Sequence, residues 1–149
     1  MKRMLWISAL ALLGLALSHL ALPGLGGVAL AAEKPYRVVF DLTSRDSLDQ
    51  RAVMRWISEI SATSPKAQME VVMYGKGFEL VMPDRSSKLA EVEEAVKNPN
   101  VSFRVCEIAL KNNNTTKEQL VKEVQTVPDG IHEIVMKQQE GWGYIKVGH

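Results

Sequence analysis

The sequence predicts a single α/β domain built around a mostly parallel β-sheet, and two observations support this. Short apolar runs of about five residues, rich in β-branched and aromatic side chains, recur along the chain after residue 35. Segments with helical periodicity separate these runs, as in repeated βαβ units. The 149 residues include one cysteine, so no intrachain disulfide can form. We therefore expect one packed domain of about 118 residues behind an amino-terminal leader.

The leader, residues 1–31, has the features of a secretory signal peptide. Two basic residues open it, residues 5–22 are almost continuously apolar, and Ala29-Leu30-Ala31 has the small-x-small spacing of a signal-peptidase site. We therefore expect export, to a bacterial periplasm, and a mature domain over residues 32–149. An uncleaved membrane anchor is the alternative, because an apolar stretch of about 18 residues lies near the lower limit for crossing a bilayer.

The charge balance excludes one class of partner. The chain has 18 Lys and Arg against 17 Asp and Glu, and two of the basic residues lie in the leader, which has no acidic residue. The remaining domain is therefore close to neutral and lacks the basic surface of a nucleic-acid-binding protein. We expect no nucleic-acid partner, and membrane contact only if the leader is retained.

The first predicted strand covers residues 36–43, whose nearly continuous apolar run is typical of a strand buried on both faces. A helix follows, because Ser47 and Gln50 form a capping-box pattern and residues 61–65 end the periodicity. The apolar positions of this helix are Leu48, Ala52, Val53, Trp56, Ile57 and Ile60.

The second predicted strand covers residues 69–74. Residues 78–82 are again apolar and predict either a short helix or an added strand, since periodicity cannot decide so short a run. A helix over residues 89–97 comes next, with Ser86 or Ser87 as its cap and an Asn-Pro stop signal behind it.

The third predicted strand, residues 101–106, shows a clean alternation of apolar and polar side chains that ends in Cys106. Residues 107–110 predict the first turn of a helix that ends in the loop 112–114. Thr116 and Gln119 form another capping box. The remaining predicted elements are a helix through Val121, a strand at 124–127, a helix from 128–130 to Gly141 and a strand at 144–147.

About five strands in a domain of this length predict a flavodoxin-like three-layer fold. In such sheets ligands bind at the carboxyl ends of the strands, near a topological switch point. The residues to examine are therefore those that follow the strands: 41–46, 74–77, 106–107 and 127–130.

Gly75-Lys76-Gly77 has two interpretations. The glycines permit a backbone nest that binds an anion, which makes these three residues candidate ligand-binding residues. The alternative, which the spacing favours, is a tight turn after a strand. Leu80 stands where a GxGxxG motif needs its last glycine, and no Walker lysine follows. We therefore expect no nucleotide cofactor.

Metal binding has little support in the sequence. Asp41, Arg45, Asp46 and Asp49 cluster after the first strand, but they lack EF-hand spacing, and a solvated, helix-capping acidic turn explains them better. His132 has no histidine or cysteine partner at metal-binding spacing, which indicates an ordinary surface histidine. We expect no metal and no other cofactor.

Cys106 is the strongest catalytic candidate. It lies where the third strand gives way to a helix, so backbone amides there would stabilise a thiolate. Arg104, on the same face of the strand, would add to this effect, and Glu107 would oppose it. A thiolate in this setting can accept a sulfane sulfur as a persulfide. The alternative is a small buried hydrophobic side chain, a common role of free cysteine.

The mature chain also resembles the DsrE/DsrF-like sulfur-relay family, particularly its small exported members. The resemblance covers residues 36–147 and is carried by VVFDLTS, a strand ending in YGKG, FRVCEIALKNN, and the tail VPDGIHEIVMKQQEGWGYIKV. It implies a flavodoxin-like fold, a homo-oligomer, and a sulfur carrier or sulfurtransferase-like relay protein that holds sulfur on Cys106. It also implies a sulfur donor or acceptor protein as partner. Two features depart from the family. The first is the export signal, because the characterised relay members are cytoplasmic. The second is the polar loop 112–114 after the cysteine segment, which would lengthen or reshape the site.

Two other readings stay open. One is a noncatalytic module that binds a small anion or a protein partner over Gly75-Lys76-Gly77. The other is a structural oligomer in which Cys106 is buried and Trp142 and Tyr144 form an interface. In the first alternative the thiol is dispensable for ligand binding. In the second it is inert to alkylation until the protein is denatured.

Overall fold

The computed structural model describes residues 35–148, so the leader predicted at residues 1–31 lies outside the described residues. These described residues form one compact unit. Within the described range, none of the helices has the length and apolar character needed to cross a bilayer.

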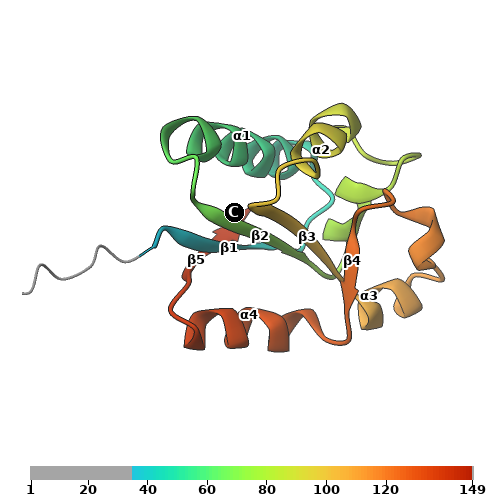
Figure 1. Cartoon of the computed structure of the whole chain (residues 1–149). Coiled ribbons are helices and arrows are strands. Elements are labelled where there is room, and N and C mark those ends of the chain that lie inside the picture. The colour runs from blue at the N-terminus through green and yellow to red at the C-terminus, as the bar shows by residue number, and fades with distance from the viewer. Residues whose placement is uncertain (1–34, 149) are drawn as a thin grey trace, which may run out of the picture. The chain divides into compact units, whose positions relative to one another are not determined.

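Five parallel strands form one sheet in the order β4-β3-β2-β1-β5. Helices α1 and α2 cover one face and α4 covers the other (Figure 1). This arrangement confirms the predicted flavodoxin-like α/β fold with a mostly parallel sheet. The strands are β1 (Arg37–Leu42), β2 (Gln68–Met73), β3 (Val101–Cys106), β4 (Gln125–Val127) and β5 (Gly143–Val147). The helices are α1 (Ser47–Thr63), α2 (Leu89–Ala95), α3 (Glu107–Asn112) and α4 (Gly130–Gln139), with short 3₁₀ helices η1 (Gly77–Val81) and η2 (Lys117–Gln119).

The two faces of the sheet hold cores of different size. The larger core lies under α1 and α2, where Phe40 of β1 stacks on Trp56 of α1 with ring centroids 6.0 Å apart. Under α4 the buried apolar cluster is small, and consists of Val39, Val72 and Ile134 with Tyr74 packed against it. Most of the apolar burial that stabilises the domain is therefore on the α1 and α2 face.

The amino-terminal cap of α1 differs from the prediction. Asp46, rather than Ser47, is the N-cap, and its Oδ1 accepts a hydrogen bond from the Leu48 amide at 2.7 Å. Gln50 does not close a capping box, because its Oε1 accepts hydrogen bonds from the amide and hydroxyl of Ser87, at 3.2 and 2.8 Å. Leu48 was predicted on the apolar face and is instead exposed. A long-range contact has therefore replaced the local one.

The cap of α2 also differs from the prediction. Lys88 is the N-cap residue and its side chain makes no capping hydrogen bond. Ser86 accepts a hydrogen bond from the Lys88 amide at 3.1 Å, whereas Ser87 is bonded to Gln50 of α1. Both serines therefore hold the loop before α2 rather than its first turn.

Two segments form 3₁₀ helices. Residues predicted as a short helix or an added strand form η1, and the capping box of Thr116 and Gln119 is present but opens only η2. The chain becomes extended at Leu120, where ψ is 162°. Leu120 and Val121 are buried, and the Val121 amide donates to the carbonyl of Val81 at 2.9 Å. Burial of these two side chains explains why the predicted helix does not continue.

Candidate functional site

Cys106 lies at the carboxyl end of β3 and is the N-cap residue of α3. Its side chain is only 5% exposed and has no disulfide partner. It nevertheless lines a cavity of about 450 Å³, which we call the Cys106 pocket. This volume falls within the ~300–1,000 Å³ typical of small-molecule sites. The lining residues are Tyr74, Gly75, Lys76, Cys106, Ile108, Ala109, Asn112, Asn113, Asp129 and Ile131.

The turn after β2 contributes one wall of the Cys106 pocket. Gly75 has φ of 58°, which favours glycine, and a side chain at Gly77 would place its Cβ 2.0 Å from the Leu42 carbonyl oxygen. The amides of Lys76 and Gly77 donate to the carbonyls of Thr43 and Tyr74, at 3.0 and 2.9 Å. These amides are therefore not free to form an anion nest, and the tight-turn interpretation is correct. Gly75 and Lys76 line the pocket, whereas Gly77 does not.

The start of α4 contributes another part of the lining, with Asp129 and Ile131. Asp129 is the N-cap, and its Oδ1 accepts hydrogen bonds from the amides of Ile131 and His132, at 2.8 and 3.5 Å. Gly130 allows the helix to approach closely, because a Cβ there would lie 3.1 Å from Cβ of Cys106. His132 is exposed and does not line the pocket. The predicted candidates at three strand ends are therefore brought together at one site.

Arg104 and Glu107 do not join Cys106 in this pocket. The Arg104 guanidinium lies 3.5 Å from Oε2 of Glu70 and donates a second hydrogen bond to Gln125 of β4. Glu107 accepts a hydrogen bond from the Thr126 hydroxyl at 2.8 Å. Both side chains have partners elsewhere, so Lys76 supplies the positive charge among the lining residues.

A second polar group, which we call the Asp41 cluster, lies beside the pocket and was not predicted. It consists of Asp41, Tyr74, Tyr144 and Lys146. The hydroxyls of Tyr144 and Tyr74 both donate to Asp41 Oδ2, at 2.6 and 3.2 Å, and Lys146 Nζ lies 3.2 Å from Oδ1. The hydrogen bond to Asp41 raises the pKa of Tyr144 to about 12. Because Tyr74 also lines the Cys106 pocket, Asp41 fixes the position of one pocket wall.

The predicted solvated acidic turn is therefore only partly correct. Asp46 is exposed and caps α1 as an acidic residue should, but Asp41 and Asp49 are buried. Between residues 35 and 148 there is no group of three or more His, Cys, Asp or Glu side chains placed to hold a metal ion. Asp41 belongs to β1 and holds the Asp41 cluster together, whereas Asp46 follows the strand and caps α1.

Glu70 forms a third polar group, beneath α4. It is 2% exposed, and its Oε2 accepts a hydrogen bond from Ser102 at 3.0 Å and lies 3.5 Å from Lys137 Nζ. Burial raises the pKa of Glu70, and Lys137 partly offsets this effect. The signal in the sequence was a single carboxylate inside each of two buried strands, Asp41 in β1 and Glu70 in β2. A buried carboxylate needs polar partners, which the sequence alone did not identify.

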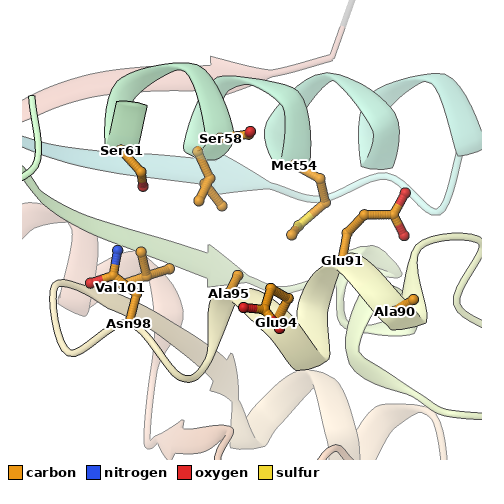
Figure 2. Close-up of a pocket in the computed structure, with 10 residues that line it drawn as sticks. Met54, Ser58, Ser61, Ala90, Glu91, Glu94, Ala95, Asn98 and Val101 are labelled. Carbon is orange, nitrogen blue, oxygen red and sulfur yellow. The ribbon is translucent and has the colours of Figure 1, made fainter. Parts of the chain in front are cut away.

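A separate cavity of about 470 Å³ lies between α1 and α2, on the other face of the sheet. Figure 2 shows Met54 projecting from α1 into this space. Its two carboxylates are already paired, Glu91 with Lys88 at 2.8 Å and Glu94 with Lys97 at 2.7 Å. Its lining includes no thiol and no histidine. The single thiol of the chain therefore lines the Cys106 pocket and not this cavity.

Comparison with solved structures finds similar domains. The domain is similar to the protein of unknown function MTH1491 from Methanobacterium thermoautotrophicum, with 29% sequence identity and a TM-score of 0.70. The similarity covers 74% of this chain and 98% of the other. No protein-family model matches the chain, and no curated protein matches it. The likeness is compatible with the α/β fold described above.

Proposed function

We propose that this chain is an exported protein of the DsrE/DsrF-like type that accepts sulfane sulfur as a persulfide on Cys106. The main support is the position of Cys106, the single cysteine of the chain, in a cavity of about 450 Å³ at the carboxyl end of an inner strand. Parallel α/β sheets place their ligand sites at such strand ends. The sequence resemblance, which spans the whole mature domain, supports the same role.

The chemistry requires the thiolate of Cys106 to attack the outer sulfur of a donor R–S–SH. The new bond joins Cys106 Sγ to that sulfur, the S–S bond of the donor breaks, and R–S takes up the proton to leave as R–SH. The transfer involves no external oxidant or reductant, because the sulfane sulfur keeps its oxidation state. Reversal with an acceptor thiol would pass the sulfur on, which is the action of a relay protein.

The surface around the pocket supports the proposal of a homo-oligomer or a partner protein. Ile108 and Ile131 line the pocket and are 51% and 60% exposed, and Val135 and Tyr144 are also exposed. Exposed apolar side chains that gather near a site mark many protein interfaces. A sulfur donor or acceptor protein, or a second copy of this chain, would cover them.

Intact-mass measurement tests the proposed function. Residues 32–149 are purified, reduced, and incubated with polysulfide or thiosulfate. We expect wild type to gain about 32 daltons for each sulfur atom accepted on the thiol, and Cys106→Ser to gain nothing. Circular dichroism of the serine variant shows that its fold is retained. No adduct in wild type with these donors or with an organic persulfide would contradict the proposal.

The alternative is a noncatalytic oligomeric module for a small anion or a protein partner, and the burial of Cys106 favours it. In that case the thiol is structural. Iodoacetamide would then alkylate Cys106 only after unfolding, and ligand binding would survive Cys106→Ser. Alkylation of the folded protein supports sulfur transfer instead, because a donor needs the same access.

A further inference from the structure

We propose that the donor taken by the Cys106 pocket is a zwitterionic amino-acid persulfide, with its carboxylate at Lys76 and its ammonium group at Asp129. This inference rests on the proposed function and names the substrate class of the same site. It follows from the size of the pocket, from the two opposite charges on its walls, and from the burial of the thiol. Cysteine persulfide is the simplest molecule with these properties.

The size of the pocket favours an organic donor. A cavity of about 450 Å³ is far larger than thiosulfate or a short polysulfide, and its volume is typical of sites for small organic ligands. Part of the lining is apolar and comes from the ring of Tyr74 and the side chains of Ile108, Ala109 and Ile131. An inorganic anion would leave these surfaces without a contact, whereas the carbon atoms of an amino acid can pack on them.

The charges of the pocket favour a ligand that carries both signs. Lys76 forms no ion pair with any residue between 35 and 148. Asp129 uses Oδ1 to cap α4, and Oδ2 makes no hydrogen bond within the same part of the chain. Each residue therefore has an ionic group available to a ligand. A compact dianion such as thiosulfate would be attracted by Lys76 and repelled by Asp129, whereas a zwitterion complements both.

The burial of Cys106 limits the shape of a donor that can reach its thiol. With 5% of its side chain exposed, the thiol can be reached only by a slender group entering through the pocket. The –CH₂–S–SH arm of an amino-acid persulfide is such a group. Attack by Cys106 on the outer sulfur gives Cys106–S–SH and releases the free amino-acid thiol, so atoms and electrons balance as in the general transfer.

Three donors with the same reactive end test this inference. Cysteine persulfide carries both charges, N-acetylcysteine persulfide lacks the ammonium group, and cysteamine persulfide lacks the carboxylate. The rate of sulfur addition to Cys106 is measured by intact mass and divided by each donor's rate with a free small thiol. The proteins compared are wild type, Lys76→Ala and Asp129→Asn, which keeps the capping oxygen. Lys111→Ala, at an exposed lysine outside the Cys106 pocket, is the matched control.

We expect wild type to react about threefold to tenfold faster with cysteine persulfide than with either truncated donor, as partly exposed ion pairs allow. Lys76→Ala should slow only the two donors that have a carboxylate. Asp129→Asn should slow only the two that have an ammonium group. Lys111→Ala should leave all three rates unchanged.

Two results would overturn the inference, and they separate it from the proposed function. Equal normalised rates for the three donors in wild type, each with a sulfur adduct, would reject zwitterion recognition and leave Cys106 a sulfur acceptor. No adduct with any donor, polysulfide included, would reject both. Circular dichroism of each variant shows whether a slower rate reflects lost folding.

Discussion

The two faces of the sheet differ in what they bury. Under α1 and α2 the sheet contributes mainly apolar side chains, including Phe40, Leu42 and Met73, to a large continuous core. Under α4 three buried apolar residues share the face with two buried carboxylates, Asp41 and Glu70, and their partners. The open Cys106 pocket lies at the end of this second face, against the first turn of α4.

This difference places a mainly apolar core on one face of the sheet and a more polar one on the other. A large apolar core tolerates no polar group without a partner, so it offers little to a substrate. The α4 face has a smaller hydrophobic contribution and holds charged groups and hydroxyls in fixed positions. Substitutions on the two faces should therefore differ in both the size and the pH dependence of their effects.

The largest effect should come from Phe40→Ala on the apolar face. Phe40 is fully buried and stacks on Trp56, so its removal leaves a cavity and should lower the free energy of unfolding by about 3–5 kcal/mol. Urea denaturation monitored by circular dichroism measures the loss. Val39→Ala on the α4 face, which removes only two methyl groups, should cost less. Equal losses for the two variants would contradict the contrast between the faces.

On the α4 face, Glu70→Gln should raise the free energy of unfolding at neutral pH, in contrast to the loss expected for Phe40→Ala. Burial raises the pKa of Glu70 above its ordinary 4.5, so the folded protein holds this proton at pH values where the unfolded chain has lost it. Wild type therefore loses stability as the pH rises through this window, and the ionised carboxylate continues to cost stability above it. Glu70→Gln has no such cost, so its stability relative to wild type should rise with pH and then level off.

Urea denaturation of both proteins between pH 4 and pH 8 gives that difference. Glu59→Gln, on the exposed side of α1, is the control for loss of a surface carboxylate. A difference that stays constant with pH would show that Lys137 fully offsets the burial of Glu70, and one that falls would show that Lys137 outweighs it.

A smaller effect is expected from Tyr144→Phe, which removes one donor from the Asp41 cluster. The loss should be about 1 kcal/mol at pH 7, near the low end for a hydrogen bond to a carboxylate because Tyr144 is 42% exposed. The pKa of Tyr144 is raised to about 12, so this contribution is complete below about pH 10 and disappears as the pH rises toward 12.

Absorbance at 295 nm, titrated from pH 9 to pH 12.5, measures the tyrosine ionisation directly. Asp41→Asn should return the titration of Tyr144 toward that of an ordinary tyrosine. An unchanged curve in Asp41→Asn would show that Asp41 is not the cause of the shift.

The smallest effect should come from Arg55→Ala, on the solvent side of α1. Arg55 and Glu59 are 3.8 Å apart and both side chains are about 60% exposed. Water and salt screen such a pair, so its loss should change stability by less than about 0.5 kcal/mol. A melting curve of Arg55→Ala at low and high salt measures it, and a loss above about 1 kcal/mol would contradict this view of the surface.

The elements of the fold could be predicted because each depends on neighbours in sequence. The alternation of residues 101–106 and the buried run in β1 reflect local burial, and both strands are found where expected. The errors occur where a distant residue competes. The side chain of Gln50 accepts a hydrogen bond from Ser87 instead of capping its own helix. Arg104 pairs with Glu70 instead of lining the pocket with Cys106.

In the candidate site, too, the local features could be predicted and the long-range contacts could not. The sequence singled out Cys106, Lys76 and Asp129 because they follow predicted strands, and all three line one pocket because the ends of parallel strands meet at one edge of the sheet. The Asp41 cluster was missed because Tyr144 and Lys146 come from β5, about a hundred residues further along the chain. Sequence spacing carries no information about such a pairing.

The pairing of β1 with β5 has a consequence for the order of events in folding. Val38 lies opposite Gly143, so the first strand acquires its outer neighbour from the far end of the domain. During synthesis β1 can pair with β2 early, but one of its edges stays open until β5 has been made. Such a long loop closure slows the last step of folding. Until then Asp41 lacks Tyr144 and Lys146, two of its three partners. The step that completes the sheet therefore also supplies the cation that neutralises this carboxylate.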